Sequence, residues 1–395
     1  MLALARKYRP AVLKDLVGQE VFVDVISNAI RMNRIHHAFL LTGTRGVGKT
    51  TSARILALSL NCVGEDGKGN ETIDPCLKCD VCKSILNGTN QDIIEFDAAS
   101  NTGVDSIREI IEQCSFSPMM SRYKIYIVDE VHMLSKSAFN ALLKTLEEPP
   151  ARVKFVFATT EIKKVPVTIL SRCQKFYLRD IPEEKISSHL QNVLQQENIN
   201  DFNIEAVNLI AKHANGSMRD GLSLLDQAIN ISSSKVDLTS VKSMLSLPDE
   251  EKIAMLFYKL YLGYADESLE IINSIMKNNA DLNALVAELL NACCDGMKCV
   301  DKIHIQSINT FMIANLEKLN ESHLLNMPRI LRMWQMIANS LSEMNFINPN
   351  LFLTSLTFKI CYVNTLPTPV EILKTVGNSN LKAAFEKFPE GRIVK

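Results

Sequence analysis

The sequence predicts an α/β domain with a parallel β-sheet, followed by two all-helical segments. The first observation is a set of near-continuous apolar runs: AFLLTG at 38–43, DIIEFDA at 92–98, KIYIVDE at 124–130 and VKFVFATT at 153–160. The second is that helical patterns such as KTTSARILALSL and KSAFNALLKTLEE lie between these runs, and the third is that only helical patterns follow Pro182. Apolar runs of this kind are typical of strands that helices cover on both faces.

The helical part divides into two segments at a polar stretch, SSSK. We expect four parts: an α/β domain over 1–180, a small helical domain over 181–243, a larger all-helical domain over 244–366 and a tail over 367–395. In the larger domain the spacing of one helix face recurs at Leu282, Leu285, Val286 and Leu289. Its many Met and Leu residues favour an ordinary helical core over a partner-facing surface.

Composition and charge exclude several classes of protein. The 43 Lys and Arg residues nearly cancel the 44 Asp and Glu residues, so any nucleic-acid-binding surface must be local. The N-terminus reaches Arg6 and Lys7 after five residues, which is too short an apolar run for a signal peptide, and no stretch offers the roughly 18 apolar residues of a membrane helix. Ten cysteines in such a chain indicate thiols or metal ligands in a reducing compartment. We therefore expect a cytoplasmic protein without a membrane partner.

A phosphate-binding loop is predicted by GTRGVGKT at 43–50, which fits G-x-x-x-x-G-K-[ST] between an apolar strand and a helix. Its glycines let successive backbone N–H groups point at phosphate oxygens beside a helix N-terminus. The alternative, a chance glycine-rich turn, does not explain why both flanks are correct. We expect Lys49 to reach the β- and γ-phosphates and Thr50 to ligate Mg²⁺. The residues predicted to bind ATP are Gly43, Thr44, Arg45, Gly46, Val47, Gly48, Lys49, Thr50 and Thr51.

Two carboxylates, Asp129 and Glu130, end the apolar strand at 124–130. A strand buried on both faces exposes an acid only at its carboxyl end, where open α/β sheets bind ligands. We expect Asp129 to hold Mg²⁺ and Glu130 to polarise the attacking water. A solvated strand end is the alternative, but it does not account for a pair of acids downstream of a phosphate-binding loop. The motifs together predict an enzyme that hydrolyses ATP.

Four cysteines have the spacing of a metal site between the phosphate-loop helix and the next strand: Cys62, Cys76, Cys79 and Cys82. CLKCDVC contains two overlapping C-x-x-C steps, and four thiolates complete a tetrahedral Zn²⁺ site. Nothing indicates an open coordination position, so the sequence predicts a structural zinc. A redox dithiol is the alternative. A histidine ligand is not available, because no histidine lies between residues 37 and 132.

The motifs also occur together in the order found in one family. KYRP, LVGQE, HHAFLLTGTRGVGKT, the cysteine insert, VDEVHMLSKSAFNALLKTLEEPP, FATT and ILSRCQKF resemble the bacterial DNA polymerase III gamma/tau clamp-loader ATPases. The matching motifs follow one another closely over residues 1 to about 230. In the helical remainder, only the architecture resembles that of the family. It implies an AAA+ P-loop NTPase domain with a zinc-binding insert, a small helical lid and an all-α collar domain.

The resemblance implies a role in DNA replication. In this family five subunits, which include delta and delta prime, assemble into a pentameric ring. ATP binding lets the ring open the sliding clamp, beta, and contact with primed DNA triggers the hydrolysis that releases the clamp around the duplex. DNA-directed DNA polymerase activity is expected from the holoenzyme and not from this chain, in which no constellation for nucleotidyl transfer is visible.

The resemblance also implies roles that no local pattern assigns. Thr160 in FATT resembles the sensor of the γ-phosphate, and Arg219 in GSMRD resembles a second sensor that reaches down from the lid. The adenine is expected to pack against Arg9, Pro10 and Val17.

DNA contacts are the point at which the sequence departs from many relatives. These relatives place basic residues near the positions of Asn101 and Gly103, which are neutral here. Lys144 remains a candidate phosphate contact, although a lone lysine on a helix is usually solvated.

Arg172 in SRC follows the strand VKFVFATT and its connecting turn. We expect it on the domain surface, away from its own phosphate-binding loop. In a ring, an arginine at such a place can reach the γ-phosphate held by the neighbour, as an arginine finger supplied in trans. The resemblance implies the same, because SRC is the family's finger motif. A surface salt bridge is the alternative.

Two further functions compete with that of a clamp-loader motor. An AAA+ remodeller or helicase that acts as a homomeric ring would require pore-loop aromatics or translocation elements, and we identify none in the sequence. A non-hydrolysing scaffold is disfavoured by Asp129 and Glu130, because inactive relatives typically lose the phosphate-binding loop or its acids.

Overall fold

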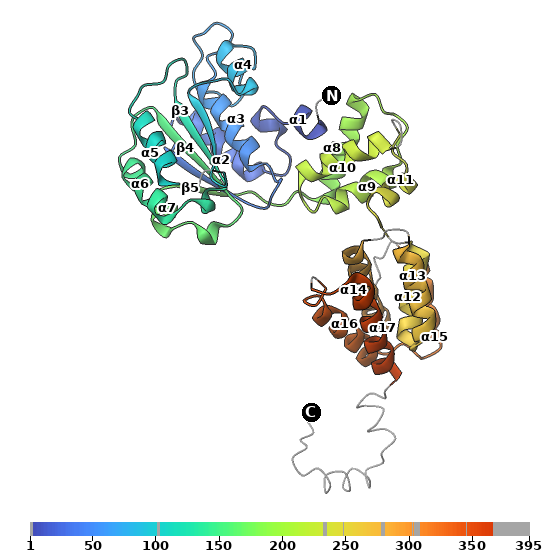
Figure 1. The fold of residues 1–395 in the computed structure, drawn as a ribbon. Coiled ribbons are helices and arrows are strands. Elements are labelled where there is room, and N and C mark those ends of the chain that lie inside the picture. The colour runs from blue at the N-terminus through green and yellow to red at the C-terminus, as the bar shows by residue number, and fades with distance from the viewer. Residues whose placement is uncertain are drawn as a thin grey trace, which may run out of the picture. The chain divides into compact units, whose positions relative to one another are not determined.

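The structure is a computed structural model that describes residues 3–100, 103–231, 235–247, 249–277, 281–301, 303, 309–344 and 346–365. The expectations for Asn101, for most of the SSSK stretch and for the tail at 367–395 fall outside these residues. The chain divides into two compact units, Met1–Val241 and Lys242–Lys395 (Figure 1). Among the described residues, no helix is long and apolar enough to cross a membrane.

The first unit is built on a five-stranded parallel sheet in the order β2–β3–β4–β1–β5. The strands are β1 (Ala38–Thr42), β2 (Ile93–Asp97), β3 (Lys124–Asp129), β4 (Val153–Thr159) and β5 (Gln174–Tyr177). The predicted parallel sheet is confirmed, and β1 to β4 lie where the apolar runs predicted them. β5 is not among the predicted strands, because this edge strand buries only Phe176 and so lacks an apolar run.

The strand register aligns the ends that carry the motif residues. Thr42 of β1 lies opposite Thr159 of β4, and Asp97 of β2 lies opposite Asp129 of β3. Since all the strands run in the same direction, the segments that follow β1, β3 and β4 leave the sheet at one edge. These three strands are neighbours in the sheet. The fold therefore brings together motifs that are far apart in the sequence.

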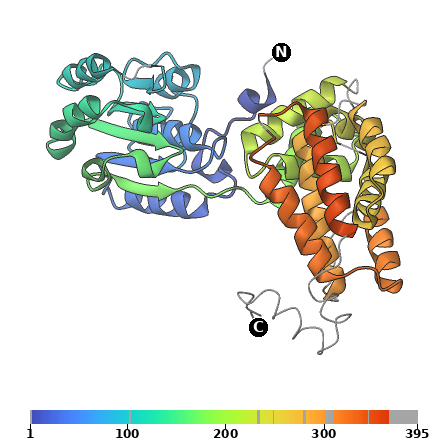
Figure 2. The ribbon, with the colours of Figure 1, turned by 60° about the horizontal axis from the view of Figure 1, so that its bottom comes forward.

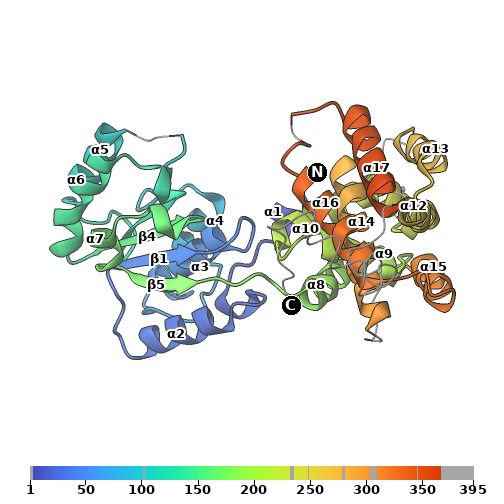
Figure 3. The same ribbon diagram turned by 90° about the horizontal axis from the view of Figure 1, so that it is seen from below.

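Helices cover both faces of this sheet (Figure 3). On one face, buried side chains of β1, β3 and β4 pack against α5 (Val104–Gln113), α6 (Lys136–Glu147) and α7 (Val167–Leu170). The helices of the other face are α2 (Glu20–Arg31) and α3 (Lys49–Asn61). On that face the ring of Phe22 in α2 meets Phe176 of β5 edge-on at 5.0 Å. Short turns complete the domain: α1 (Leu4–Lys7), η1 (Leu13–Asp15), η2 (Val131–Met133) and η3 (Ile162–Lys164).

The segment between α3 and β2 forms a small module around α4 (Asp80–Asn87), whose apolar face packs on the end of α3. Arg122, just before β3, fixes the module. Its guanidinium donates to the Leu60 carbonyl at 2.6 Å and to the Gly69 carbonyl at 2.6 Å. A cation beside the last carbonyls of a helix is stabilising. Arg122 therefore caps α3 and holds the insert at the same time.

The helices of the lid are α8 (Glu183–Gln196), α9 (Ile204–His213), α10 (Met218–Ile231) and the start of α11 (Leu238–Met244). The N-terminal residues pack on these helices, with α1 against α10. Lys7 Nζ and Tyr8 Oη both donate to Glu197 Oε1, each at 2.6 Å. Residues 4–10 thus connect the lid to the α/β domain.

The regular structure in the described part of the second unit is all helical (Figure 2). Its described helices are α12 (Glu250–Leu262), α13 (Ala265–Met276), α14 (Leu282–Val300), α15 (Thr310–Glu321), α16 (Met327–Ser340) and α17 (Pro349–Thr365). Their apolar faces form one core, which includes Leu285, Val286 and Leu289 as the spacing predicted. Buried Tyr261 donates to the Leu324 carbonyl at 3.0 Å and accepts from the Asn326 N–H at 2.9 Å. The tyrosine thereby fixes the turn between α15 and α16.

Asp92, just before β2, is a buried carboxylate that organises the loop before β3. It is fully buried and accepts the N–H groups of Met119, Met120 and Ser121 at 2.8–2.9 Å. Burial opposes ionisation, but these N–H bonds outweigh it and hold the pKa of Asp92 below its ordinary value. The charged form therefore stabilises the fold.

We predict that Asp92→Asn lowers the free energy of unfolding by about 2–4 kcal/mol, because the amide leaves buried N–H groups unsatisfied. A group whose pKa is depressed by folding contributes stability above its unfolded pKa of about 3.9, and that contribution is lost as the pH falls through the folded value. The wild type should therefore lose stability below about pH 4 more steeply than the variant. Urea unfolding at several pH values measures both effects.

Asp24→Asn on the exposed side of α2 is the matched control, expected to stay within about 0.5 kcal/mol of wild type. Equal stability of Asp92→Asn and Asp24→Asn would contradict the role of Asp92.

Candidate nucleotide site and cysteine cluster

The phosphate-binding loop connects β1 to α3 and is shaped by its glycines. Gly46 and Gly48 have φ values of 77° and 107°, which residues other than glycine rarely adopt. A Cβ at Gly46 would lie 1.9 Å from Ser217 Oγ, on the lid. The glycines therefore allow both the wrapping of the loop and the close approach of the lid to it.

Lys49 is the first residue of α3 and is buried beneath this loop. Its Nζ donates to the carbonyls of Gly43 at 3.0 Å and Thr44 at 2.8 Å. Burial lowers the pKa of Lys49, and the nearby carboxylates of Glu130 and Asp129 only partly offset this effect. A phosphate group at this position would supply the negative charge that the buried ammonium lacks.

Thr50 and Asp129 bring α3 and β3 together. Thr50 Oγ1 donates to Asp129 Oδ2 at 2.6 Å. A hydroxyl and a carboxylate are the hard oxygen ligands that Mg²⁺ prefers, and Mg²⁺ usually takes few protein ligands beside the phosphates of its substrate. These two side chains therefore suit the metal that accompanies ATP.

Glu130 follows β3 in the left-handed conformation, with φ 46°. Its Oε2 accepts the Thr160 hydroxyl at 3.1 Å and the Thr160 N–H at 3.4 Å. Thr160 follows β4, the neighbour of β3 in the sheet. The structure thus places these two predicted site residues in contact, next to the Asp129–Thr50 pair.

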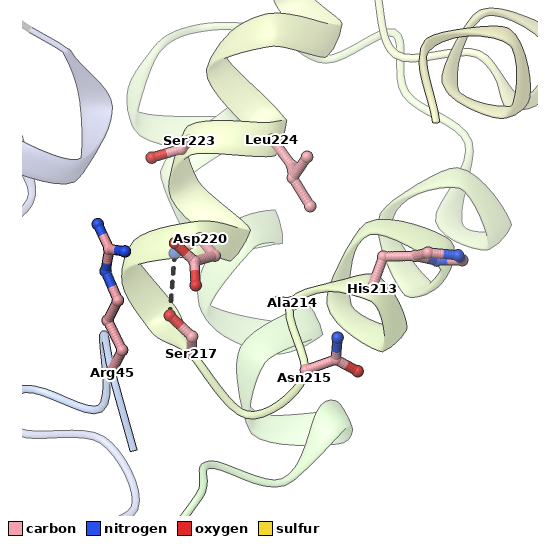
Figure 4. A pocket seen from close by; sticks show the side chains of 8 residues that line it. All are labelled: Arg45, His213, Ala214, Asn215, Ser217, Asp220, Ser223 and Leu224. Carbon is pink, nitrogen blue, oxygen red and sulfur yellow. Dashed lines mark hydrogen bonds between the residues drawn. The ribbon is translucent and has the colours of Figure 1, made fainter. Parts of the chain in front are cut away.

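The lid closes over the phosphate-binding loop through the start of α10. Ser217 Oγ accepts the Asp220 N–H at 3.2 Å, as a capping residue does, and the Arg219 N–H points at the Gly46 carbonyl at 3.5 Å. Figure 4 shows Arg45 extending from the loop along α10, where Ser217, Asp220 and Ser223 face it. These residues line an open pocket with His213, Ala214, Asn215 and Leu224.

Arginines gather beside the loop. Arg9 is half-buried, and burial together with the positive charges of Arg54 and Arg219 lowers its pKa, while Glu95 opposes this shift. Arg54 lies one turn after Thr50 in α3. Its guanidinium donates through Nε and Nη2 to the two carboxylate oxygens of Glu95. An anionic ligand beside Arg9 would offset the burial and repulsion that lower its pKa. The other residues expected at the adenine, Pro10 and Val17, are half-buried before α2.

Arg172 lies near the N-terminal end of β1, whereas the phosphate-binding loop follows the C-terminal end of that strand. Arg172 precedes β5, whose first residue, Gln174, pairs with Phe39 near the start of β1. Its guanidinium donates to the Thr168 carbonyl at 2.6 Å and forms an ion pair with Glu147 at the end of α6. The side chain is 30% exposed. Arg172 is therefore accessible and away from its own loop.

The candidate DNA-contacting positions are less informative. Gly103 is the residue before α5, and Lys144 is exposed on α6.

The four predicted cysteine ligands converge. The sulfurs of Cys62, Cys76, Cys79 and Cys82 all lie within 4.8 Å of one another. Backbone N–H groups approach three of these sulfurs: that of Cys76 lies 3.3 Å from Cys62, that of Cys79 lies 3.4 Å from Cys76, and that of Cys82 lies 3.4 Å from Cys79. Such donors stabilise thiolates and orient them around a metal. The four-thiol set is compatible with Zn²⁺.

Acidity differs within this cluster. Burial opposes ionisation of Cys76, but the N–H groups of Cys79 and Lys78 outweigh it and lower the pKa of Cys76 to about 7. Burial raises the pKa of Cys82. A divalent cation would overcome this resistance, since metal binding removes thiol protons.

Several residues that shape the nucleotide site are not among those predicted from the sequence. Asp180 in the connection to the lid accepts the Thr44 hydroxyl at 2.5 Å, and Gln19 holds the same connection through the Arg179 backbone. His132 lies against Glu130 and Thr159. No local pattern marks Asp180 or Gln19. His132 lies in the motif VDEVHMLSKS, two residues after Glu130, and this proximity in the sequence could have identified it as a neighbour of the predicted base.

Comparisons with known proteins agree along the chain. The family model "DNA polymerase III, delta subunit" matches residues 18–182, "DNA polymerase III clamp loader subunit, ATPase lid domain" matches residues 185–234, and "DNA polymerase III subunits gamma and tau domain III" matches residues 236–376.

Relatives match along much of the chain. The DNA polymerase III subunit gamma of Buchnera aphidicola is 46% identical over 287 residues, which cover 73% of this chain and 78% of that protein. The subunit tau of Bacillus subtilis is 35% identical over 403 residues, which cover 97% of this chain and 70% of that protein. The subunit tau of Escherichia coli is 44% identical over 287 residues, with 73% and 44% covered, so the match spans less than half of that longer protein. The chain belongs to the gamma/tau family of DNA polymerase III clamp-loader subunits, with an AAA+ ATPase fold.

Proposed function

We propose that this chain is an ATP-hydrolysing motor subunit of the bacterial clamp loader, which loads the sliding clamp onto primed DNA during replication. One observation carries the proposal: Lys49, the Thr50–Asp129 pair and the Glu130–Thr160 pair meet at one edge of the sheet. Such a set is suited to phosphoryl transfer to water, in which positioning and charge stabilisation supply most of the catalysis. A non-hydrolysing scaffold has no need of a carboxylate at Glu130.

The positions of these residues suit the following proposed roles. Lys49 would neutralise the β- and γ-phosphates, and Thr50 and Asp129 would hold a Mg²⁺ that neutralises the charge developing during the transfer. Glu130 orients and deprotonates the water whose oxygen attacks the γ-phosphorus, while the bond to the ADP oxygen breaks. Thr160, in contact with Glu130, senses the γ-phosphate. Arg219 reaches the phosphates from the lid, and Arg9, Pro10 and Val17 border the adenine.

Assembly with other clamp-loader subunits follows from the family. We propose a pentameric ring with delta and delta prime, formed through the helical collar at about 244–366, with the lid at 181–243 above the AAA+ domain at 1–180. The ring acts on the beta clamp and on primed DNA in the cytoplasm, at the nucleoid. The homomeric helicase remains the second candidate, and no feature of the described residues favours it.

The position of Arg172 agrees with the proposed ring. It lies at the end of the sheet opposite its own phosphate-binding loop and is partly exposed, which suits an arginine finger that enters the neighbouring subunit's site. Zinc on the four cysteines would fasten the insert to the end of α3. Cys62 directly follows that helix, and α4 packs against it. We assign this zinc a structural role, because four thiolates leave no open coordination position.

The first prediction about the proposed function separates ground-state ATP binding from the chemical step. Lys49→Ala should abolish productive ATP binding, because the loop loses the buried cation that neutralises the β- and γ-phosphates. Glu130→Gln should bind ATP with unchanged affinity but lose at least about 100-fold in turnover, since the amide cannot accept the proton. Equilibrium binding of an ATP analogue and phosphate release, measured with clamp and primed DNA, give the two results.

Lys136→Ala, on the exposed start of α6, is the control for loss of a lysine and should behave as wild type. Turnover by Glu130→Gln near the wild-type rate would remove Glu130 as the base, and unwinding by homomeric rings would favour the helicase.

The second prediction concerns Arg172. Arg172→Ala should leave ATP binding intact and slow hydrolysis in the adjacent subunit by about 10³- to 10⁵-fold, the usual effect of a finger. In assemblies mixed with Lys49→Ala subunits, activity should appear only where an intact Arg172 faces an intact Lys49. Glu147→Gln, which frees the arginine from its ion pair, is the matched control and should retain activity. Full activity in a uniform Arg172→Ala assembly would make the arginine structural.

The third prediction concerns the metal. The purified protein should contain about one equivalent of zinc per chain, and Cys79→Ala should lose most of it, because three thiolates bind zinc far more weakly than four. Elemental analysis gives the stoichiometry, and limited proteolysis should show a loosened insert with ATP binding largely retained. Cys294→Ala removes an exposed cysteine elsewhere and should keep its zinc. Less than half an equivalent in the wild type would contradict the assignment.

A further inference from the structure

A histidine lies directly behind Glu130. The turn η2 follows Glu130 and returns the side chain of His132 beneath it, where only 6% of that side chain is exposed. His132 Nδ1 lies 3.4 Å from Glu130 Oε2 and 3.0 Å from Thr159 Oγ1. The other ring nitrogen, Nε2, lies 3.4 Å from Glu161 Oε1. The imidazole therefore stands between two carboxylates.

The imidazole is held from the end of β4. Thr159 is the last residue of this strand and is fully buried, and its Oγ1 also accepts the Glu161 N–H at 3.0 Å. Glu161 is in turn held by Lys164 Nζ at 2.8 Å. Rotation of the ring would break its contacts on both sides. A histidine that only filled space would not need polar partners at both nitrogens.

The contacts on Glu130 converge on one oxygen. The Thr160 hydroxyl, the Thr160 N–H and His132 Nδ1 all approach Oε2. Oε1 is then the oxygen available to receive a proton from water. A carboxylate that is fixed through one oxygen loses less freedom in the transition state than one that rotates.

We propose that His132 is a positioning residue for hydrolysis: with Thr159 behind it, its ring sets where the Glu130 carboxylate lies. This inference rests on the proposed role of Glu130 as the base. His132 touches neither nucleotide nor water in this scheme and acts only through Glu130. It should therefore affect the chemical step and leave ATP binding unchanged.

Two substitutions of His132 distinguish positioning from packing. His132→Leu fills the volume without a polar atom, whereas His132→Asn places an amide where Nδ1 lies. In the assembly with the other clamp-loader subunits, clamp and primed DNA, single-turnover hydrolysis by His132→Leu should fall about 10- to 100-fold, as misplacement of a catalytic group does. His132→Asn should recover part of this loss. The affinity for an ATP analogue should be unchanged in both.

The same two substitutions in a Glu130→Gln background give the sharper result. If His132 acts through Glu130, neither should lower the residual rate further, because residues that act as a unit are not additive. His189→Leu, a partly buried histidine on α8 of the lid, is the control and should retain the wild-type rate. Thr159→Val removes the hydroxyl that holds the ring and should give a smaller loss, so the inference stays testable if His132→Leu does not fold.

Several outcomes would overturn the inference. Hydrolysis by His132→Leu at or above the rate of His132→Asn would make the ring a packing group. Multiplied losses in the Glu130→Gln background, or weaker analogue binding in step with the rate, would place the effect elsewhere. Wild-type hydrolysis by Glu130→Gln would instead remove the base itself, whereas an inactive Glu130→Gln with a fully active His132→Leu would remove only the role of His132.

Discussion

The parallel register of β1, β3 and β4 is the constraint on which the rest of the site depends. Since these strands are neighbours and end together, the segments after Thr42, Asp129 and Thr159 need no long excursions to meet. The segment after β1 contributes backbone N–H donors and a lysine. The segment after β3 contributes carboxylates, and the segment after β4 contributes hydroxyls. A shift of register by one residue would turn Asp129 toward the other face and separate it from Thr50.

Charge balance is the second constraint, and it makes the site responsive to ATP. A buried ammonium and two carboxylates lie together at Lys49, Asp129 and Glu130, and the pKa of the lysine is lowered because burial outweighs its acidic neighbours. A triphosphate with its metal would add charge of both signs and would neutralise the lysine and the carboxylates together. Lys49 would then exchange the carbonyls of Gly43 and Thr44, which hold it in this structure, for phosphate oxygens. Electrostatics would thus link binding to a local rearrangement of the loop.

Most of the sheet and the main site groups could be predicted from the sequence, because strands buried on both faces leave long apolar runs and the phosphate-binding loop has a fixed spacing. β5 could not be predicted in the same way, since an edge strand with one buried residue, Phe176, leaves no such run. Contacts such as Thr44 with Asp180 depend on where the lid returns to the loop, 136 positions along the chain. Only tertiary packing decides such pairs, and no local pattern encodes them.

The ion pair between Arg172 and Glu147 bears on how the ring would be switched. In the single chain the guanidinium is neutralised by a half-exposed carboxylate, and such a pair contributes less than about 1 kcal/mol. A finger that stabilises the transition state in a neighbouring site lowers the barrier by about 4 to 7 kcal/mol. Loss of the Glu147 pair in the transition state would therefore cost little beside the barrier that a finger removes. Glu147 would not prevent Arg172 from acting as a finger once the subunits are in contact.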